Sequence, residues 1–232
     1  MKILDVEQGS EAWKAARRGI PTASQFHRIL SPARLKISDS SFGYACELVA
    51  ERLLGEDIGQ DATAFMERGS LLEQEAIAYY EFQAGVETTK VGLCLSDDER
   101  VGCSPDRLVG KEGGLELKCP SAAVHVGYLL SNMGDKYRLQ VQGALWITGR
   151  KWWDLLSYNP DLPTALIRCY PDAEVFDALD QAIPVFCEEL DRFMNRLRPE
   201  TGSKDGRGAS APVAQESAVS GIITIPFLER QR

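Results

Sequence analysis

Several features that would assign a chain to a common protein class are missing from this sequence. No apolar run approaches the roughly 18 consecutive residues that a membrane-spanning helix requires, and the first residues, MKILDVEQGSE, contain no apolar signal core. No P-loop motif is present, which argues against ATP-driven work. Serine, cysteine and histidine have no spacing typical of a nucleophilic triad. We therefore expect a cytoplasmic protein with no part in a membrane.

Cysteine and histidine are poorly arranged for a zinc site or a disulfide framework. The six cysteines form no Cys-x-x-Cys pair, and the chain has only two histidines. This pattern argues against structural zinc, and reduced thiols suit the cytoplasm better than disulfides do. Neither histidine is expected to take part in catalysis or metal binding, and we expect His125 on the surface of a helix.

Charge is distributed unevenly along this acidic chain. The whole sequence has a net charge of −8, but residues 1–38 contain seven Lys or Arg against three Asp or Glu, a local charge of +4. An acidic body with one cationic face can hold a polyanion at that face and repel it elsewhere. Ordinary solvated helix charges explain the same pattern equally well, so charge alone leaves nucleic-acid binding open.

Apolar periodicity and turn residues predict an α/β fold. Strands are expected over 90–95, 152–158 and 165–170, and in a hairpin within 101–120. Helices are expected over 10–18, 22–30, 42–54, 121–133, 135–147 and 172–197, and over a longer segment that ends near residue 83. Pro184 should kink or divide the last helix. This order predicts a single domain with a central mixed β-sheet flanked by helices on both faces.

The composition changes after Pro199. The segment GSKDGRGASAPVAQESAVSG is rich in Gly, Ser and Ala and has no periodic apolar face, so a flexible linker and tail are expected over 199–232. The final residues, IITIPFLERQR, suit an edge strand, a segment that docks on a neighbouring subunit, or a disordered end. The folded domain is therefore expected to span residues 1–198.

The hairpin within residues 101–120, VGCSPDRLVGKEGGLELKCP, has the most informative pattern. Its glycine-rich turn supplies the positive φ angles that hairpin turns need. In its second strand the two leucines would face the core, while Glu116 and Lys118 point to the opposite face. Asp106, on the first strand or its bend, could come up beside them.

These three side chains suit a metal-dependent phosphodiesterase. Two carboxylates offer hard oxygen ligands for Mg²⁺, and an adjacent lysine can orient or deprotonate a water. Charges on a solvated hairpin are the alternative, and a single D-x9-E-x-K pattern does not decide between them. The preceding helix offers a further acid, for which the candidates are Glu67, Glu73, Glu75 and Glu81. Glu73 follows two leucines, so we expect it to face inwards towards the sheet.

A second pattern suits a phosphate. In RRGIPTAS, Arg17 precedes a helix N-terminus that carries hydroxyls such as Ser24. Free backbone N–H groups, the helix dipole, hydroxyl donors and a bidentate arginine all favour an anion. A helix cap beside surface arginines is the alternative. On the helix that follows the hairpin, Gln140 is positioned to hydrogen-bond the lysine or a water, while Gln142 is expected to be exposed.

Taken together, six segments resemble the bacteriophage lambda exonuclease-type viral recombinases, or alkaline exonucleases, of the PD-(D/E)XK nuclease superfamily. The segments are EQGSEAWKAARRGIPTAS, GSLLEQEA, CSPDRL, GLELKCP, YRLQVQGALWIT and WWDLLSYNP. They have the family's order and similar spacings over residues 5–197. The resemblance implies a restriction-endonuclease-like core and a phage or prophage protein of the bacterial cytosol. It also implies a ring-shaped homotrimer that degrades one strand of duplex DNA processively from its 5′ end. Such an enzyme releases 5′-mononucleotides and leaves a 3′ overhang for a single-strand annealing protein.

The resemblance also implies roles for the acidic cluster. Two Mg²⁺ ions per site, which Mn²⁺ could replace, would be held by Asp106, Glu116, the backbone carbonyl of Leu117, and Glu73. Lys118 would orient the attacking water and help to deprotonate it. Gln140 would support that water or that lysine.

Further roles follow for residues that contact the DNA end. Arg17, Ser24, Arg34 and Ser104 would form the pocket for the terminal 5′-phosphate, and Met66 would be the apolar wedge that separates the strands. Pro21 stands where the family usually has a β-branched residue. Two other functions stay open, namely a DNA endonuclease on the same core and a non-catalytic module that binds DNA ends.

Overall fold

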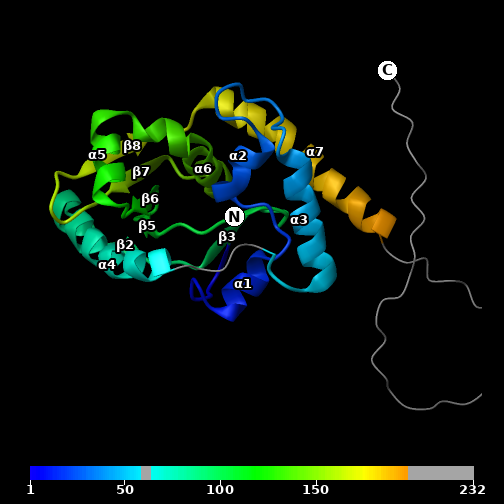
Figure 1. Cartoon of the computed structure of the whole chain (residues 1–232), viewed down its shortest axis with the longest axis horizontal. Helices are drawn as coiled ribbons and strands as arrows, with labels where there is room; N and C mark the ends of the chain where they lie inside the picture. Colours follow the sequence, from blue (N-terminus) through cyan, green and yellow to red (C-terminus); the bar gives the residue numbers. More distant parts are fainter. Residues whose placement is uncertain (59–63, 198–232) are drawn as a thin grey trace, which may run out of the picture.

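The computed structural model describes residues 1–58 and 64–197, with side chains for 1–58 and 72–197 (Figure 1). The helical elements are α1 (Glu11–Arg17), the 3-10 helix η1 (Ala23–Gln25), α2 (Phe26–Ile29), α3 (Ser41–Leu54), α4 (Ala64–Ala84), α5 (Ala122–Leu130), α6 (Met133–Thr148) and α7 (Ala173–Leu197). The strands are β1 (Lys2–Leu4), β2 (Thr88–Thr89), β3 (Leu93–Leu95), β4 (Gly102–Cys103), β5 (Arg107–Val109), β6 (Gly113–Lys118), β7 (Trp152–Ser157) and β8 (Ala165–Cys169). The linker and tail predicted over 199–232 lie outside the described residues.

Within the described part of the chain, five strands form a mixed sheet in the order β2-β5-β6-β7-β8. β6 and β7 pair in parallel, and the other neighbours pair antiparallel. The helices α5 and α6 form the crossover that a parallel pair requires. A smaller antiparallel sheet contains β1, β3 and β4. The predicted mixed α/β architecture is confirmed, although β1 was not predicted, because three residues are too few to show an alternating pattern.

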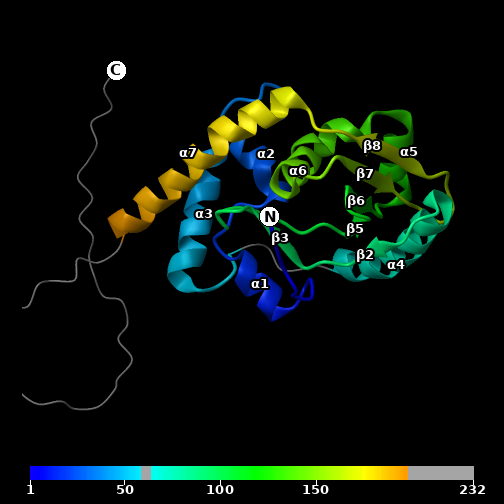
Figure 2. The same cartoon turned by 180° about the vertical axis from the view of Figure 1, so that it is seen from behind.

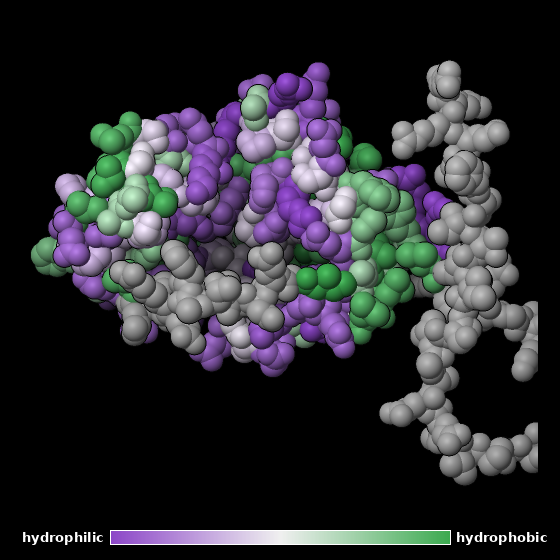
Figure 3. All heavy atoms as spheres, viewed as in Figure 1, coloured by the Kyte–Doolittle hydropathy of each residue, from purple (hydrophilic) through white to green (hydrophobic). Residues whose placement is uncertain are grey.

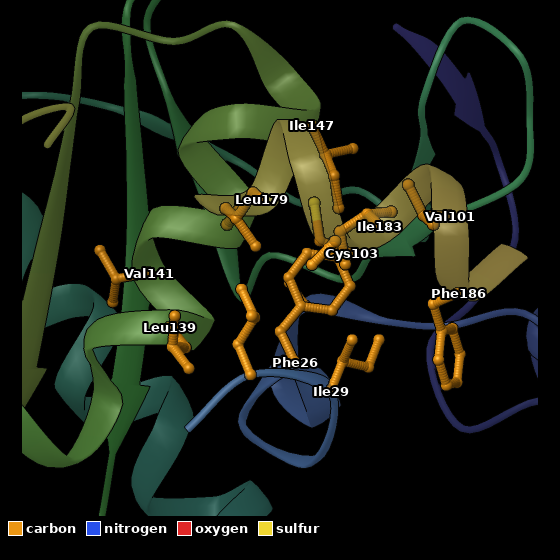
Figure 4. Close-up of a cluster of buried hydrophobic side chains, with 14 of the residues drawn as sticks. Phe26, Ile29, Val101, Cys103, Leu139, Val141, Ile147, Leu179, Ile183 and Phe186 are labelled. Atoms are coloured by element: carbon orange, nitrogen blue, oxygen red, sulfur yellow. The ribbon is translucent and has the colours of Figure 1, made fainter. Parts of the chain in front are cut away.

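Helices cover both faces of the five-stranded sheet (Figures 1 and 2). On one face, a large core includes Phe26 from α2, Leu139 from α6 and Ile183 from α7 (Figure 4). On the other face, α4 contributes Ala76 and Tyr80 to a smaller cluster with the two leucines of β6. Burial of each large apolar side chain contributes roughly 1.5–3 kcal/mol. Strand β6 therefore lies in the centre of the sheet, between β5 and β7, with its two leucines packed in the smaller cluster.

The segment 22–30 differs from the single capped helix that its sequence predicts. It forms η1 and then the short helix α2, and Thr22 makes no side-chain cap. The physical reason is that the backbone here pairs with β4. Gly102 donates its N–H to Pro21 O at 3.0 Å, and Thr22 is extended in a parallel bridge with Gly102. This bridge brings Ser24 close to β4.

Two polar side chains that were expected at the surface are buried, so both predictions were wrong. His125 is fully buried in α5, where its Nδ1 lies 2.7 Å from Ser157 Oγ and its Nε2 lies 2.8 Å from Pro163 O. Gln142 in α6 donates to Tyr170 O at 2.8 Å and accepts from Asp172 N at 2.9 Å. Both side chains satisfy backbone and hydroxyl groups of distant loops and strands, which helical periodicity cannot indicate.

Helix α7 continues through Pro184, so the proline does not divide it. Its buried stripe, which includes Leu179 and Phe186, packs on the large core along its length. On the face drawn in Figure 3, exposed apolar side chains gather over α3, which carries Phe42 and Leu54. Among residues 1–58 and 64–197, none of the helices has the length and apolarity that crossing a membrane would require. All six cysteines are free thiols.

Candidate active site

The predicted hairpin is formed by β5 and β6, and it brings Asp106 and Glu116 together. The strands pair antiparallel, with Arg107 opposite Leu115. Asp106 directly precedes β5, and its Oδ2 accepts a hydrogen bond from Leu117 N at 2.5 Å. The predicted alternation is confirmed, because the leucines of β6 pack in the smaller cluster while Glu116 lines a cleft on the opposite face.

Lys118 and Gln140 converge on the Glu116 carboxylate. Lys118 Nζ lies 2.6 Å from Glu116 Oε1, and Gln140 Nε2 donates to the same oxygen at 2.5 Å. Gln140 comes from α6, which packs over this face of the sheet, and it reaches the carboxylate rather than the lysine. Within the described part of the chain, Glu116 Oε2 and Asp106 Oδ1 accept no hydrogen bond. Each carboxylate thus has one oxygen left for a further ligand.

The electrostatics of this cluster favour an added cation. Burial and the neighbouring charge of Glu116 raise the pKa of Asp106 well above its usual range, although the Leu117 N–H and Lys118 oppose this. Burial has the largest effect on the pKa of Lys118 and lowers it, but the charge and hydrogen bond of Glu116, together with the charge of Asp106, outweigh burial and raise that pKa. The buried Glu116 carboxylate and the half-buried Asp106 carboxylate therefore share one lysine, and hard oxygen donors of this kind suit Mg²⁺.

Glu73 lies on α4, near this cluster but not within it. Its side chain is exposed, yet after burial and Glu116 its charge is a further cause that raises the pKa of Asp106. It also acts after burial to raise the pKa of Cys119 to about 11. Among the residues whose side chains are described, no group of three His, Cys, Asp or Glu is arranged to hold a metal ion. The described geometry thus supplies two close carboxylates and a third at longer range.

A basic pocket adjoins the acidic cluster. Arg17 Nη1 donates to Ser104 Oγ at 2.9 Å, and Trp13 Nε1 donates to the same oxygen at 3.0 Å. The Arg17 guanidinium lies over the Trp13 ring, 4.2 Å from its centroid. No described carboxylate lies within ion-pair distance of Arg17, and burial lowers its pKa. An arginine held in this way can bind an anion from outside the chain.

One cleft of about 70 Å³ joins the basic pocket to the acidic cluster. Its lining includes Arg17, Ser24, Ser104, Glu116, Gln140 and Trp153. The fold therefore brings together side chains from α1, η1, β4, β6 and α6, regions that are far apart in the sequence. Most other basic residues of the N-terminal region are neutralised by carboxylates, in the pairs Lys2–Glu99, Lys14–Glu11, Arg18–Asp57 and Arg28–Glu47.

Two predicted DNA contacts are not among the described residues that line this cleft. Arg34 is exposed in a tight turn, where Ser31 N donates to Lys36 O at 2.8 Å, and it is absent from the described lining of the cleft. The side chain of Met66 lies outside the described residues. Both assignments stay predictions.

Sequence reasoning missed two aromatic residues that support the site. Trp13 lies one turn before Arg17 on α1, and Tyr137 lies one turn before Gln140 on α6. Tyr137 places its ring centroid 4.8 Å from Lys118 Nζ. Residues three or four apart share a face of a helix, so this spacing is the signal that could have identified both.

The chain is similar to one described family and to several solved structures. Residues 12–151 match the family described as "YqaJ-like viral recombinase domain". Two solved structures of the alkaline exonuclease LHK-Exo, from Laribacter hongkongensis, are 31% identical to this chain. The alignments cover 82% of this chain and 96% of theirs, with TM-scores of 0.73 and 0.72. The first of these structures is a complex with dAMP. A phage-related exonuclease from Haemophilus somnus 129PT shares the fold at 15% identity, with a TM-score of 0.63, over 77% of this chain and 96% of its own. None of the curated proteins compared with this chain matches it.

Proposed function

We propose that this chain, which belongs to the YqaJ-like viral recombinase family, is a Mg²⁺-dependent exonuclease that degrades one strand of duplex DNA from its 5′ end. The observation that carries the proposal is the cleft that joins an acidic cluster to an anion pocket. A phosphodiester at the cluster and a terminal phosphate in the pocket would belong to the same strand end. The identity to an alkaline exonuclease supports a nuclease, and the dAMP bound to that relative is a mononucleotide of the kind this reaction would release.

The acidic cluster performs the hydrolysis in this proposal. Asp106, Glu116, the carbonyl of Leu117 and Glu73 would hold two Mg²⁺ ions, for which Mn²⁺ could substitute. When bound, such ions lower the pKa of a coordinated water and stabilise negative charge on the scissile phosphate. Lys118 would orient the attacking water, and its positive charge would help deprotonation by favouring the hydroxide form of that water. The Gln140 amide donates to Oε1 of Glu116 and so fixes the carboxylate, while Oε2 remains free of that bond.

The basic pocket determines the direction in which the DNA strand is digested in this proposal. Arg17 offers paired N–H donors to the terminal 5′-phosphate. Ser104 Oγ already accepts from Arg17 and Trp13, so its own O–H remains available as a donor. The Ser24 hydroxyl completes the pocket. A phosphate held here fixes the strand end next to the cluster after each cut, which supports stepwise release of 5′-mononucleotides.

Assembly and partners complete the proposal. Three copies form a ring around the DNA and digest it processively. The 3′ overhang passes to a single-strand annealing protein in recombination, Met66 separates the strands, and Arg34 adds a phosphate contact. These points rest on the family resemblance of the sequence.

A linear duplex labelled at either the 5′ or the 3′ end tests the proposal, with Mg²⁺ or with a chelator. We expect early release of the 5′ label as a mononucleotide, only with Mg²⁺, and no digestion by the Lys118→Ala variant. Early release of the 3′ label would show that digestion starts from the 3′ end instead. Rapid cutting of a covalently closed circle would instead favour an endonuclease, and end binding without hydrolysis would favour a binding module.

A further inference from the structure

Lys118 contacts two different groups at its ammonium end. One is the Glu116 carboxylate, 2.6 Å from Nζ, and the other is the face of the Tyr137 ring, whose centroid lies 4.8 Å from Nζ. A cation within about 6 Å of an aromatic face is attracted by the ring quadrupole. We propose that Tyr137 is a positioning residue for Lys118, and that Tyr128 and Lys136 hold Tyr137 in place. This inference rests on the proposed function and adds to it residues that act through the lysine.

Tyr137 is itself held by a second tyrosine. The Tyr128 and Tyr137 rings meet edge to face, with centroids 6.0 Å apart at 80°, a favoured arrangement for aromatic pairs. Their hydroxyls lie 2.8 Å apart, and Lys136 Nζ donates to Tyr128 Oη at 2.9 Å. An ammonium group can only donate, so Tyr128 Oη accepts this bond.

The hydroxyl bond links the two tyrosines in either direction of donation. Burial raises the pKa of Tyr137 to about 12. Burial acts in the same direction on Tyr128, but hydrogen bonds with Lys136 and Tyr137, together with the charges of Lys136 and Lys118, outweigh it and lower the pKa of Tyr128. Tyr128 is thus hydrogen-bonded to both neighbours. The two rings and the Lys136 ammonium form a connected unit beside Lys118.

This unit is tied to the sheet through His125. The fully buried imidazole donates from Nε2 to Pro163 O at 2.8 Å and pairs through Nδ1 with Ser157 Oγ at 2.7 Å. Ser157 is the β7 residue in register with Lys118 on β6. Tyr128 lies one turn beyond His125 on α5, so the anchor fixes Tyr128 relative to the strand that carries the lysine.

The Tyr137 ring limits the conformations that the long Lys118 side chain can adopt. Lysine has a flexible four-carbon stem, and without the ring its ammonium would be held by Glu116 alone. A misplacement of about 1 Å at a reacting group can cost roughly a hundredfold in rate. Tyr137 therefore restricts Lys118 to the position from which it acts on the water, and the aromatic ring rather than its hydroxyl provides the contact.

Steady-state kinetics of four variants tests this assignment, with DNA ends as the substrate. We expect Tyr137→Leu to lower kcat about tenfold with KM changed less than about twofold, because the ring contact is lost. Tyr137→Phe keeps the ring and should retain kcat within about twofold. Tyr128→Phe should have a smaller effect than Tyr137→Leu, since it removes the hydroxyl contacts with Tyr137 and Lys136 but keeps both rings. Tyr170→Leu, at a tyrosine that is 62% exposed, is the matched control and should act like the wild type.

A second readout does not depend on activity. In protein labelled with ¹³Cε-lysine, the resonance that disappears in Lys118→Ala identifies Lys118, and the Tyr137 ring current should shift it upfield. We expect this shift to persist in Tyr137→Phe and to vanish in Tyr137→Leu. Wild-type kcat in Tyr137→Leu, or equal losses in the Phe and Leu variants, would overturn the assignment, as would an unshifted lysine resonance. An active Lys118→Ala variant would instead overturn the proposed catalytic role of the lysine.

Discussion

Replacement of Arg17 by alanine is the most direct test of how the cleft distinguishes DNA ends. In the structure, Arg17 contacts neutral partners, the Ser104 hydroxyl and the Trp13 ring. Its loss therefore leaves no buried carboxylate without a partner. The expected cost in stability is about 1–2 kcal/mol, from one hydrogen bond and one stacking contact. The variant should fold and bind DNA, so a change in end preference can be measured.

The expected effect on end preference is larger. Hydrogen bonds to a charged group contribute about 1.5–3 kcal/mol, and 1.36 kcal/mol corresponds to a factor of ten. Arg17→Ala should therefore lower the preference for 5′-phosphorylated over 5′-hydroxyl ends by about 10- to 150-fold. The Arg17→Lys variant should recover only part of it, because an ammonium lacks the planar fork of N–H donors.

The assay is a competition between two linear duplexes that differ only in the 5′ group and carry different fluorophores. Arg28→Ala is the matched control, because Arg28 lies in the same basic region but pairs with Glu47 at 2.6 and 2.7 Å. We expect this control to keep the wild-type preference. If the preference survives in Arg17→Ala, or is lost equally in Arg28→Ala, the phosphate pocket lies elsewhere.

Three further predictions concern the acidic cluster and the sheet. Lys118→Ala should lower turnover by at least about a hundredfold while DNA-end binding persists, and an unchanged rate would refute its catalytic role. Burial and Glu116 raise the folded-state pKa of Asp106 above its unfolded value. The stability that this group contributes is therefore fully present below about pH 4 and is lost as the pH rises through the folded-state pKa. In urea unfolding with a chelator, Asp106→Asn should thus have a larger free energy of unfolding than the wild type at pH 7. Its free energy of unfolding should also not decline as the pH rises. Parallel plots of the free energy of unfolding against pH for the two proteins would contradict this explanation. Asp154 is 1% exposed and pairs with Arg168, which is 45% exposed. Arg168→Ala removes the ion pair and leaves the buried carboxylate with only the Tyr80 hydroxyl as a described side-chain partner. It should cost about 3–5 kcal/mol, more than Asp154→Asn does; the reverse order in urea unfolding would rule this out.

The part of the site that could be predicted is the part governed by local rules. The alternation of apolar and charged residues along β6 correctly predicted that the leucines face one side of the sheet while Glu116 and Lys118 face the other. The glycine-rich turn correctly predicted the hairpin of β5 and β6. Asp106 came to the cluster because it directly precedes a strand in the same hairpin. The link between Arg17 and Ser104 was suggested by the family resemblance, since 87 residues separate them and no local rule connects them.

The errors arose where distant segments meet. α5 carries apolar residues on most of its surface, so its pattern could not indicate that His125 is buried against Ser157. The capping pattern of Thr22 was overridden by the backbone pairing of this segment with Gly102. Gln142 was expected to be exposed, but it satisfies backbone groups at Tyr170 and Asp172. In each case a tertiary hydrogen bond decided the outcome.

The central position of β6 has a consequence for how this protein tolerates insertions and deletions. Alternate residues of the strand serve the smaller apolar cluster and the acidic cluster, and the strand is paired on both edges. Loss or gain of one residue between Gly114 and Lys118 would turn Glu116 and Lys118 towards α4 and turn the leucines into the cleft. Length changes here would therefore remove the fold and the chemistry in a single step, whereas the glycine-rich turn before the strand can vary in length without this exchange of faces.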